Sequence, residues 1–324
     1  MIALLGLALG CSGSPTASTT MGATTPAGVT AQAQAPPWAP PAGFSHLRIA
    51  LTPYLDTAAL LKEHEGFREW LSDRLHVPVE LNVATGYDDL GRQMRNGDVD
   101  LGEFSPYAYV RARAADPGLD PLVSYIAAGA ATAAGYIVVD AGSRFHDLED
   151  LRGARFAFVD RASTSGFLYP HRLLVDRGID PETAFKQVDF LGNHKAVLLA
   201  VHGGQDDAGA VFEPALHELE ATQGIPATAF RIVAKTERIP NDLLCAAATL
   251  PQPVRDELQR LLLGLNVANG EGANVLTPMR INAFVAADDH AYDPVRAADA
   301  ALHTGGAPDA CHAQECAGVR VGPP

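Results

Sequence analysis

The chain is predicted to adopt an α/β fold with two lobes, and three observations support this prediction. Short apolar runs alternate with segments of helical spacing from residue 46 onward. This alternation occurs in two successive units, and the chain then returns to the first unit. Strands that alternate with helices form parallel sheets with helices on their faces. We therefore expect each lobe to be a mainly parallel sheet flanked by helices, with two crossover hinge segments near residues 132–136 and 234–241.

The first unit begins with an apolar strand at 46–51, which a Thr-Pro turn ends. Residues 57–75 are expected to form a helix because their large apolar side chains recur at helical spacing. The unit continues with a strand at 77–83, a helix at 87–96 closed by Gly97, and a strand at 100–104. Sheets of this type bind ligands at the carboxyl ends of their strands.

The second unit repeats the alternation, with a glycine, Gly178, placed as the left-handed residue that commonly follows a helix. We expect strands at 136–139, 154–159, 208–212 and 230–234, and helices at 171–177, 195–202 and 254–267. The expected domains are a first lobe at 46–134 plus 238–302, a second lobe at 135–237, and a C-terminal extension at 303–324.

Composition narrows the classes of function. The 324 residues carry a net charge of −14, and residues 1–45 contain no Asp, Glu, Lys or Arg. Nucleic-acid binding needs a basic surface, so no nucleic-acid partner is expected. A small anion remains possible as a ligand, because a buried site can differ in sign from the surface as a whole.

The N-terminal segment predicts export. Residues 1–11 are apolar up to Cys11 and are too short to span a bilayer, which takes about 20 residues. The segment is typical of a secretion signal, and residues 7–11 resemble the bacterial lipoprotein box, in which Cys11 would carry the lipid. A plain signal peptide with an incidental cysteine is the alternative. Residues 12–45 are Pro-rich and small, as expected of a disordered tether.

One segment combines the features of an anion site. A predicted strand ends at Asp160, and the hydroxyl triplet Ser163, Thr164 and Ser165 follows just before a helix. The start of a helix has free backbone N–H groups and a partial positive charge. Three hydroxyls with those groups can hold a tetrahedral oxyanion without Lys or Arg. Ordinary N-capping by Ser or Thr is the alternative explanation.

Several short motifs carry a family resemblance when they are taken in order. They lie at residues 51–54, 102–107, 160–166, 192–194, 207–211, 239–242 and 292–296. With these motifs the chain resembles the phosphonate/phosphite substrate-binding proteins of ABC importers, a branch of the type 2 periplasmic binding proteins, over about residues 46–300. The resemblance implies the two-lobed fold of that class, with the ligand between the lobes.

The resemblance also implies which residues bind the ligand. Tyr54 and Tyr107 match tyrosines whose hydroxyls reach the ligand from the first lobe. The hydroxyl triplet matches the oxyanion-binding residues of the second lobe, and His194 matches a histidine that contacts the same oxyanion. Asp242 matches a carboxylate that faces the ligand. Glu213 lies about one residue from the position that binds the amine in aminoalkylphosphonate binders.

The chemistry of three of these residues restricts their roles. His194 would supply a hydrogen-bond donor, or a charge if the bound anion raised its pKa; alternatively it is structural. A carboxylate beside an oxyanion is repulsive unless a proton or an ammonium lies between them, so Asp242 would select ligands that carry one. A structural Asp in a turn is the alternative there. Asp207 is expected to brace a strand end behind the site.

The cysteines and the remaining motifs do not predict catalysis or metal binding. Cys245 lies in an apolar run and is expected to be a buried thiol. Cys311 and Cys316 would close a small disulfide loop, and their spacing matches no standard zinc pattern. The sequence lacks the common hydrolase, metalloprotease and nucleotide-binding motifs. We therefore expect no enzyme, no metal and no cofactor.

These expectations combine into one function. The chain would be an exported, lipid-anchored and monomeric receptor of an ABC importer. It would bind a small phosphorus oxyanion between its lobes and deliver it to a membrane permease. A sensory or scavenging protein of the same fold, which signals instead of transporting, is the alternative.

Overall fold

The computed structural model describes residues 38–304 of the chain. The predicted signal with Cys11, most of the predicted tether, and the pair Cys311 and Cys316 lie outside these residues. No helix between residues 38 and 304 is long and apolar enough to cross a membrane.

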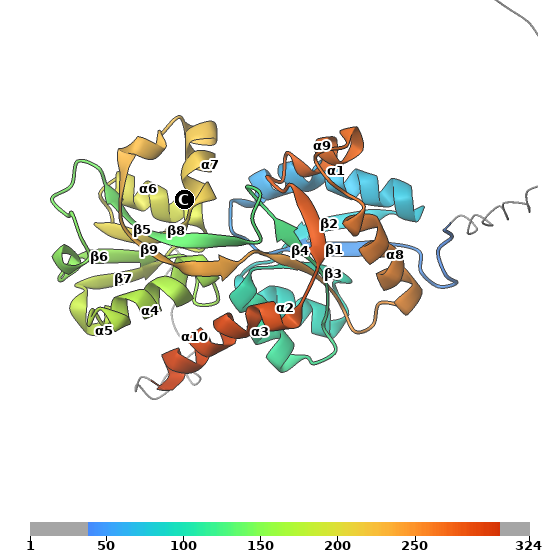
Figure 1. Ribbon diagram of the computed structural model, residues 1–324, viewed down its shortest axis with the longest axis horizontal. Coiled ribbons are helices and arrows are strands. Elements are labelled where there is room, and N and C mark those ends of the chain that lie inside the picture. The colour runs from blue at the N-terminus through green and yellow to red at the C-terminus, as the bar shows by residue number, and fades with distance from the viewer. Residues whose placement is uncertain (1–37, 305–324) are drawn as a thin grey trace, which may run out of the picture. The chain divides into compact units, whose positions relative to one another are not determined.

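The strands form two sheets, one in each lobe (Figure 1). The strands of the first lobe are β1 (Leu47–Leu51), β2 (Val79–Val83), β3 (Leu101–Phe104), β4 (Asp120–Ile126), β10 (Leu243–Ala246) and β11 (Ala283–Ala286). Those of the second lobe are β5 (Thr132–Asp140), β6 (Arg155–Phe158), β7 (Gln187–Phe190), β8 (Ala208–Phe212) and β9 (Phe230–Pro240). The strand orders are β11-β4-β10-β3-β1-β2 and β7-β6-β8-β5-β9. The predicted two-lobed α/β fold is confirmed.

Helices cover both sheets (Figure 1). The first lobe contains α1 (Thr57–Leu75), α2 (Tyr87–Asn96), α3 (Pro106–Ala115), α8 (Gln252–Leu263) and α9 (Gly270–Leu276). The second contains the π-helical turn η2 (Thr164–Leu168), α4 (Tyr169–Asp176), α5 (Pro181–Ala184), α6 (His194–His202) and α7 (Pro214–Gln223). Short 3-10 turns lie at η1 (Glu149–Leu151), η3 (Ala227–Ala229) and η4 (Asp289–Tyr292), and the last described helix is α10 (Asp293–Thr304).

Two helices have the bounds that their sequence predicts. Helix α1 begins after Asp56, whose carboxylate accepts the Ala59 N–H at 3.0 Å. Helix α2 ends at Asn96, and Gly97 follows with a φ of 79°. A side-chain cap at the start and a left-handed residue at the end are local signals. This is why the sequence alone places both helices correctly.

Both sheets are mixed, so the expectation of mainly parallel sheets holds only in part. β1 is parallel to β2 and β3, and β6 is parallel to β7 and β8. The strands β4, β10 and β11 add an antiparallel half to the first sheet, and β5 and β9 do so in the second. The reason is the path of the chain. The strands that directly follow the two crossovers, β5 and β10, run opposite to the parallel strands of the sheet that they join.

The two crossovers lie side by side. The chain leaves β4 and enters β5 through residues 127–131, and it returns from β9 to β10 through residues 241–242. β5 and β9 pair along their length, from Thr132 opposite Pro240 to Asp140 opposite Phe230. β9 is therefore longer than the predicted strand at 230–234, and the predicted hinge residues 132–136 and 234–240 belong to this paired ribbon.

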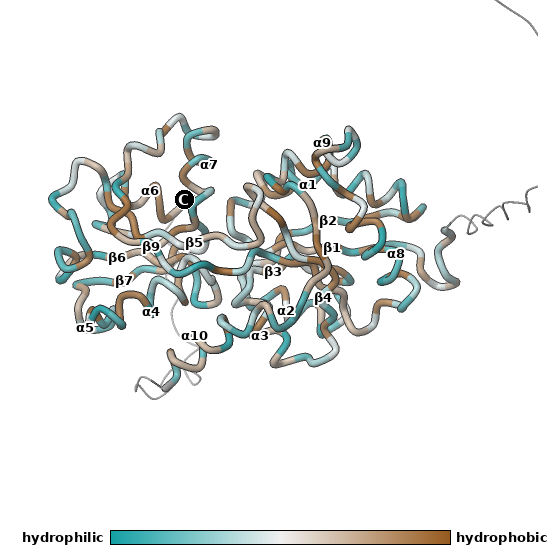
Figure 2. The backbone as a smooth tube through the Cα atoms, viewed as in Figure 1, coloured by the Kyte–Doolittle hydropathy of each residue, from teal (hydrophilic) through white to brown (hydrophobic). Residues whose placement is uncertain are grey.

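The core consists of two hydrophobic clusters. One fills the face of the first sheet that α1, α8 and α9 cover. Trp38 and Phe44, which lie within the predicted tether, pack against this cluster. The other contains the second sheet and the side of the first lobe near α2, α3 and α10. Figure 2 shows hydrophobic residues along the strands of both sheets. Helix α10 packs against α3 of the first lobe and against η2 and α4 of the second.

Candidate functional site

The hydroxyl triplet lies where the second lobe meets the first. Ser163 is buried at the start of η2, and its Oγ accepts the Gly166 N–H at 3.1 Å. Thr164 is also buried, and its Oγ1 accepts the backbone N–H of Tyr107 from the first lobe at 2.8 Å. Ser165 is only partly buried. The triplet thus forms a capped turn, and the hydroxyl of Thr164 is hydrogen-bonded to the first lobe.

The turn after β6 is wider than an α-helical turn. The residues that follow Ser163 form one π-helical turn before α4 begins at Tyr169. Turns of this kind are frequent at functional sites. A glycine is required within it, because a Cβ on Gly166 would lie 2.4 Å from a methyl group of Val159. Asp160 holds the loop by accepting the Ala162 N–H at 2.8 Å.

Tyr107 contributes its backbone and not its hydroxyl. Its hydroxyl donates to Asp299 of α10 at 2.6 Å, whereas its N–H binds the triplet. The expected reach of this hydroxyl to the ligand is therefore not what the structure shows. The reason is local, since Tyr107 stands in the first turn of α3 with its ring packed between this helix and α10.

Tyr87 is a candidate site residue that the sequence reasoning missed. It is the first residue of α2, and its hydroxyl is buried without a well-formed hydrogen bond among the described residues. Burial raises the pKa of Tyr87, and Ser163, Asp160 and Asp242 all act on the same hydroxyl. The signal that was available is its place in the chain: it follows the carboxyl end of the parallel strand β2, where ligands of such sheets bind.

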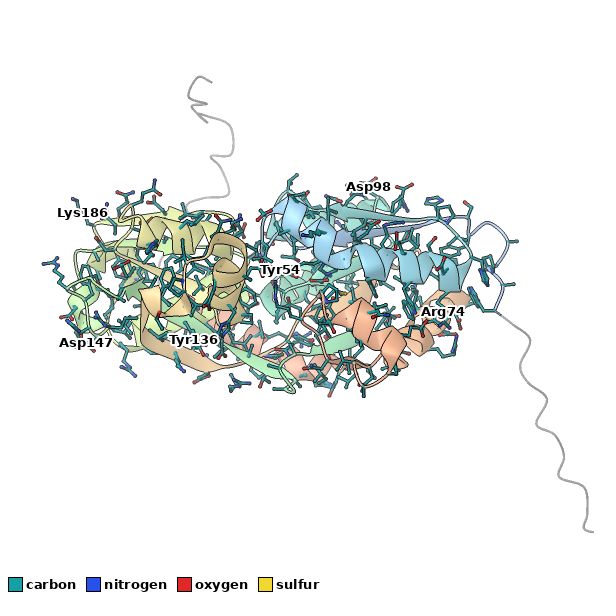
Figure 3. The ribbon with its side chains drawn as sticks, turned by 90° about the horizontal axis from the view of Figure 1, so that it is seen from above. Tyr54, Arg74, Asp98, Tyr136, Asp147 and Lys186 are labelled. Carbon is teal, nitrogen blue, oxygen red and sulfur yellow. The ribbon has the colours of Figure 1, made fainter. Side chains whose placement is uncertain are left out.

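Tyr54 lies at the junction of the lobes (Figure 3). Its ring packs edge-to-face on Phe212 of the second lobe, with ring centroids 6.1 Å apart. Its carbonyl accepts the N–H of His194 at 3.2 Å. Burial, followed by the charge of Glu103, holds the pKa of the Tyr54 phenol well above its usual range. The Tyr54 hydroxyl therefore lies near three carboxyl groups of the first lobe, those of Glu103, Glu63 and Asp242.

His194 is buried at the first position of α6 and is neutral. Its Nδ1 accepts the N–H of Phe212 at 3.2 Å, which leaves the proton of the neutral ring on Nε2. Burial lowers the pKa of His194 to about 3. Of the two ligand-binding roles expected for this residue, the charged one disagrees with this pKa, whereas the uncharged donor and the structural alternative both agree with these contacts.

Asp242 is partly buried just before β10. Burial, followed by the charge of Glu103, keeps its pKa well above the usual range of an Asp. Its carbonyl accepts the N–H of Tyr125 at 3.0 Å. A raised pKa favours the protonated carboxyl of Asp242, which is the form that does not repel an oxyanion.

The two remaining candidates lie on different sides of the second lobe. Asp207 precedes β8 and forms an ion pair with Arg155 at 2.9 Å, while also accepting the Arg155 N–H, so it braces the amino ends of β6 and β8. Glu213 follows β8 and acts on the hydroxyl of Tyr136 in β5. Burial and then Glu213 raise the pKa of Tyr136 to about 12. Lys235 lies over the same ring, 4.8 Å from its centroid.

Among residues 38–304, no group of three or more His, Cys, Asp and Glu side chains is arranged to hold a metal ion. Cys245 is a buried free thiol. Within the described residues, the Tyr87 hydroxyl of the first lobe interacts with Ser163 of the second lobe and with Asp160 and Asp242. Hydroxyl groups placed in this way suit an anion that is held by hydroxyl and imidazole groups.

Comparison with known proteins identifies the family. The family model described as "ABC transporter, phosphonate, periplasmic substrate-binding protein" matches residues 49–292. The chain belongs to this family of periplasmic substrate-binding proteins. It is therefore a substrate-binding protein of the ABC-transporter class, and the family's compartment implies export.

Individual relatives agree with this assignment. The chain is 28% identical over 226 residues to the phosphate-import protein PhnD of Mycolicibacterium smegmatis, covering 66% of this chain and 70% of that protein. It is 27% identical over 171 residues to the probable phosphite binding protein PhnD1 of Prochlorococcus marinus, covering 51% of this chain and 57% of that protein.

Solved structures show the same fold. The structure of PhnD1 from Prochlorococcus marinus in complex with methylphosphonate has a TM-score of 0.74 at 22% identity, covering 80% of this chain and 98% of that one. A binding-protein component of a phosphonate transporter from Pseudomonas aeruginosa has a TM-score of 0.73 at 24% identity, covering 79% and 85%.

Proposed function

We propose that the chain is the receptor of an ABC importer that closes its lobes on a phosphonate- or phosphite-type oxyanion and delivers it to a membrane permease. The observation that carries the proposal is the meeting of two sets of hydroxyl groups. The buried hydroxyl of Tyr87 interacts with Ser163 across the boundary between the lobes. A tetrahedral oxyanion between them would satisfy the donors of both lobes at once, which links binding to closure.

The donors define the chemistry of the ligand. The oxyanion would receive hydrogen bonds from the hydroxyls of Ser163, Ser165 and Tyr87, from Nε2 of His194, and from the protonated carboxyl of Asp242. None of these groups is charged, so the site would hold an anion through directed hydrogen bonds rather than through an ion pair. Glu213 and the Tyr136 hydroxyl would face an organic substituent, and an amine on that substituent would pair with Glu213.

A thermal-shift screen tests the ligand class. Phosphite, hypophosphite, methylphosphonate, 2-aminoethylphosphonate, phosphate and sulfate are offered separately to the purified chain. A ligand that binds only the folded state raises the melting temperature once its concentration exceeds the Kd. We expect at least one phosphorus oxyanion to raise it, and an unchanged melting temperature with all six would refute the ligand class. Bound ligand recovered unchanged by phosphorus NMR would agree with a receptor that has no turnover.

Anchoring and assembly are separate parts of the proposal. Cys11 lies outside the described residues, and the support for its lipidation is its position after the apolar segment in the sequence. In cells, the unaltered chain is expected in the membrane fraction and Cys11→Ala in the soluble exported fraction. Retention of Cys11→Ala in the membrane would contradict the lipid anchor. The purified domain is expected to elute as a monomer.

A further inference from the structure

Helix α3 of the first lobe begins without a cap from its own N-cap residue. That residue is Ser105, and serine commonly accepts a free N–H group of the first helical turn. The Ser105 side chain makes no such bond, and its hydroxyl is buried without a partner among the described residues. Pro106 follows at the first helical position and has no N–H. Tyr107 therefore carries the first free N–H group of the helix.

The cap comes from the second lobe instead. Oγ1 of Thr164 on η2 accepts the Tyr107 N–H at 2.8 Å. Thr164 is 2% exposed and Tyr107 is 1% exposed, so water does not replace this bond while the two residues are packed together. A buried N–H group without an acceptor is costly. The bond forms only where η2 lies against α3, which makes it a contact between the lobes.

Other helices of the molecule are capped from their own N-cap residues. Asp56 caps α1, Asn193 accepts the Ala196 N–H of α6 at 2.9 Å, and Asn269 accepts the Gly272 N–H of α9 at 2.6 Å. Helix α3 has a residue of the same kind at its N-cap and yet is capped across the boundary between the lobes. The cap of α3 is therefore a property of the assembled molecule and not of the local sequence.

Tyr107 is also held at the other end of its side chain. Its hydroxyl donates to Asp299 of α10 at 2.6 Å, and the guanidinium group of Arg111 lies over its ring, 5.6 Å from the centroid. Both contacts are made to helices that pack in the first lobe. The Tyr107 N–H thus has a fixed place in the first lobe, and the cap depends on where η2 brings the Thr164 hydroxyl.

Thr164 stands between the two serines that are proposed to bind the oxyanion. An anion held by Ser163 and Ser165 would fix η2, because the three residues are consecutive in one turn that the Ser163 hydroxyl caps. With η2 fixed, the Thr164 hydroxyl stays within reach of α3. Ligand binding and the cap of α3 therefore favour the same position of the second lobe.

We propose that Thr164 is a positioning residue for ligand binding, whose hydroxyl caps α3 across the boundary and thereby stabilises the arrangement in which the lobes enclose the ligand. The proposal rests on the proposed function in taking Ser163 and Ser165 as ligand contacts. Separation of the lobes breaks the cap and lets both of its partners bind water. Without the Thr164 hydroxyl, closure buries the Tyr107 N–H with no acceptor, so the open arrangement is favoured.

The first test is hydrogen exchange of the Tyr107 N–H in the ligand-free chain. The eight tyrosines are labelled with 15N, and loss of one NMR signal in Tyr107→Phe identifies that of Tyr107. We expect Thr164→Val, which lacks the acceptor, to raise the Tyr107 exchange rate about tenfold, whereas Thr164→Ser should keep it slow. The Tyr109 N–H, which binds the Ser105 carbonyl at 2.9 Å, should change in neither variant. An equal Tyr107 rate in Thr164→Val and the unaltered chain would overturn the proposal.

A control variant separates the cap across the boundary from a local one. Ser105→Ala removes the hydroxyl that would cap α3 from its own sequence, and it should leave the Tyr107 exchange rate unchanged. Faster exchange in Ser105→Ala would show that α3 caps itself and would overturn the proposal. If Thr164→Val fails to fold, the unaltered chain still decides, because a Tyr107 N–H that exchanges as fast as in an unstructured peptide would also overturn it.

Methylphosphonate affinity then links the cap to ligand binding. By calorimetry we expect Kd to rise about tenfold in Thr164→Val and to stay within about twofold in Thr164→Ser. An unchanged Kd in Thr164→Val would overturn the proposal. A raised Kd with slow Tyr107 exchange would overturn it too, because Thr164 would then act as a ligand contact. If the unaltered chain binds no oxyanion while the exchange results hold, the proposed function fails and the cap stands.

Discussion

Burial acts in opposite directions on two ionisable residues of the cleft. It lowers the pKa of His194 to about 3, and it raises that of Asp242 well above its usual range. His194 is therefore uncharged at neutral pH, and Asp242 takes up a proton more readily than an ordinary Asp. An acidic chain with a net charge of −14 can in this way hold an anion without a cationic pocket.

The neutrality of His194 predicts a specific loss of stability in acid. Its pKa is about 3 when folded, against an ordinary 6.5 when unfolded. Below pH 6.5 the unfolded chain gains a proton that the folded chain does not, so stability falls as the pH drops toward 3. Between pH 6.5 and 5 this amounts to about 2 kcal/mol.

His194→Asn keeps an acceptor for the Phe212 N–H but has no such titration. Urea unfolding of both proteins at the two pH values should show that the unaltered chain loses about 2 kcal/mol more than the variant. Equal losses in the two proteins would mean that His194 is charged in the folded state.

The double variant Ser163→Ala with Ser165→Ala should abolish oxyanion binding and keep the fold. Removal of the Ser163 cap should cost about 1 kcal/mol of stability. Thr183→Ala is the control, because it removes a hydroxyl that binds Asp180 elsewhere in the second lobe. Calorimetry should show binding in the control and none in the double variant, and retained affinity would place the oxyanion at a different site.

Some site residues can be predicted from the sequence and others cannot. The hydroxyl triplet can be predicted, because a cap, a glycine and a strand end are local signals. Whether Tyr107 or Tyr87 directs its hydroxyl to the site cannot be predicted, because the direction of a hydroxyl depends on the side chains that pack around its ring. Asp299, which takes the Tyr107 hydroxyl, is far away in the sequence.

Among the elements, the paired ribbon of β5 and β9 forms the connection between the lobes. Where it enters the first lobe, the amide of Asn241 donates to the carbonyls of Tyr125 and Ala130, at 3.0 and 2.8 Å. Its own N–H donates to the carbonyl of Ala131 at 3.0 Å. One side chain therefore ties the returning strand to the outgoing one at the hinge.

Asn241→Ala should destabilise the protein by about 1–3 kcal/mol, because it removes both hydrogen bonds that the Asn241 amide donates at the hinge. Asn82→Ala on the exposed side of β2 is the control and should change stability by no more than about 0.5 kcal/mol. Urea unfolding measures both. A similar small effect in the two variants would show that the Asn241 amide contributes little at the hinge.

Element prediction succeeded where the signals were local and failed where pairing was distant. Helices α1 and α2 were placed correctly from caps and spacing. Strands β4, β10 and β11 were not anticipated, because they are defined by antiparallel partners far along the chain. The sheets therefore proved mixed although the βαβ order of the first unit was read correctly.

At the scale of the whole molecule, ion pairs span the boundary between the lobes. Arg280 of the first lobe pairs with Glu63 on α1 and with the buried Glu218 on α7 of the second lobe. Lys195 on α6 pairs with Asp56 at the start of α1, at 2.9 Å. Opening of the lobes would separate both pairs, so they favour the closed arrangement.

Arg280→Met should weaken ligand binding about fivefold or more, because it leaves the buried Glu218 without its cation across the boundary. The difference from the unaltered chain should shrink only in part in 1 M NaCl, because salt screens a pair with a buried partner less than an exposed pair. Arg74→Met is the control, because Arg74 pairs with Glu271 within the first lobe. Calorimetry at two salt concentrations measures this, and equal affinities of the two variants would show that the bridge plays no part in closure.

Helix α10 restricts how the molecule can move. It contacts α3 in the first lobe and both η2 and α4 in the second, so it spans the boundary on the side away from α1 and α9. When the lobes separate, either α10 loses its contacts with one lobe or the lobes rotate about α10. If the ligand binds at η2 as proposed, its departure would be transmitted to α10 through these contacts, and its exit path would lie on the side that α10 does not cover.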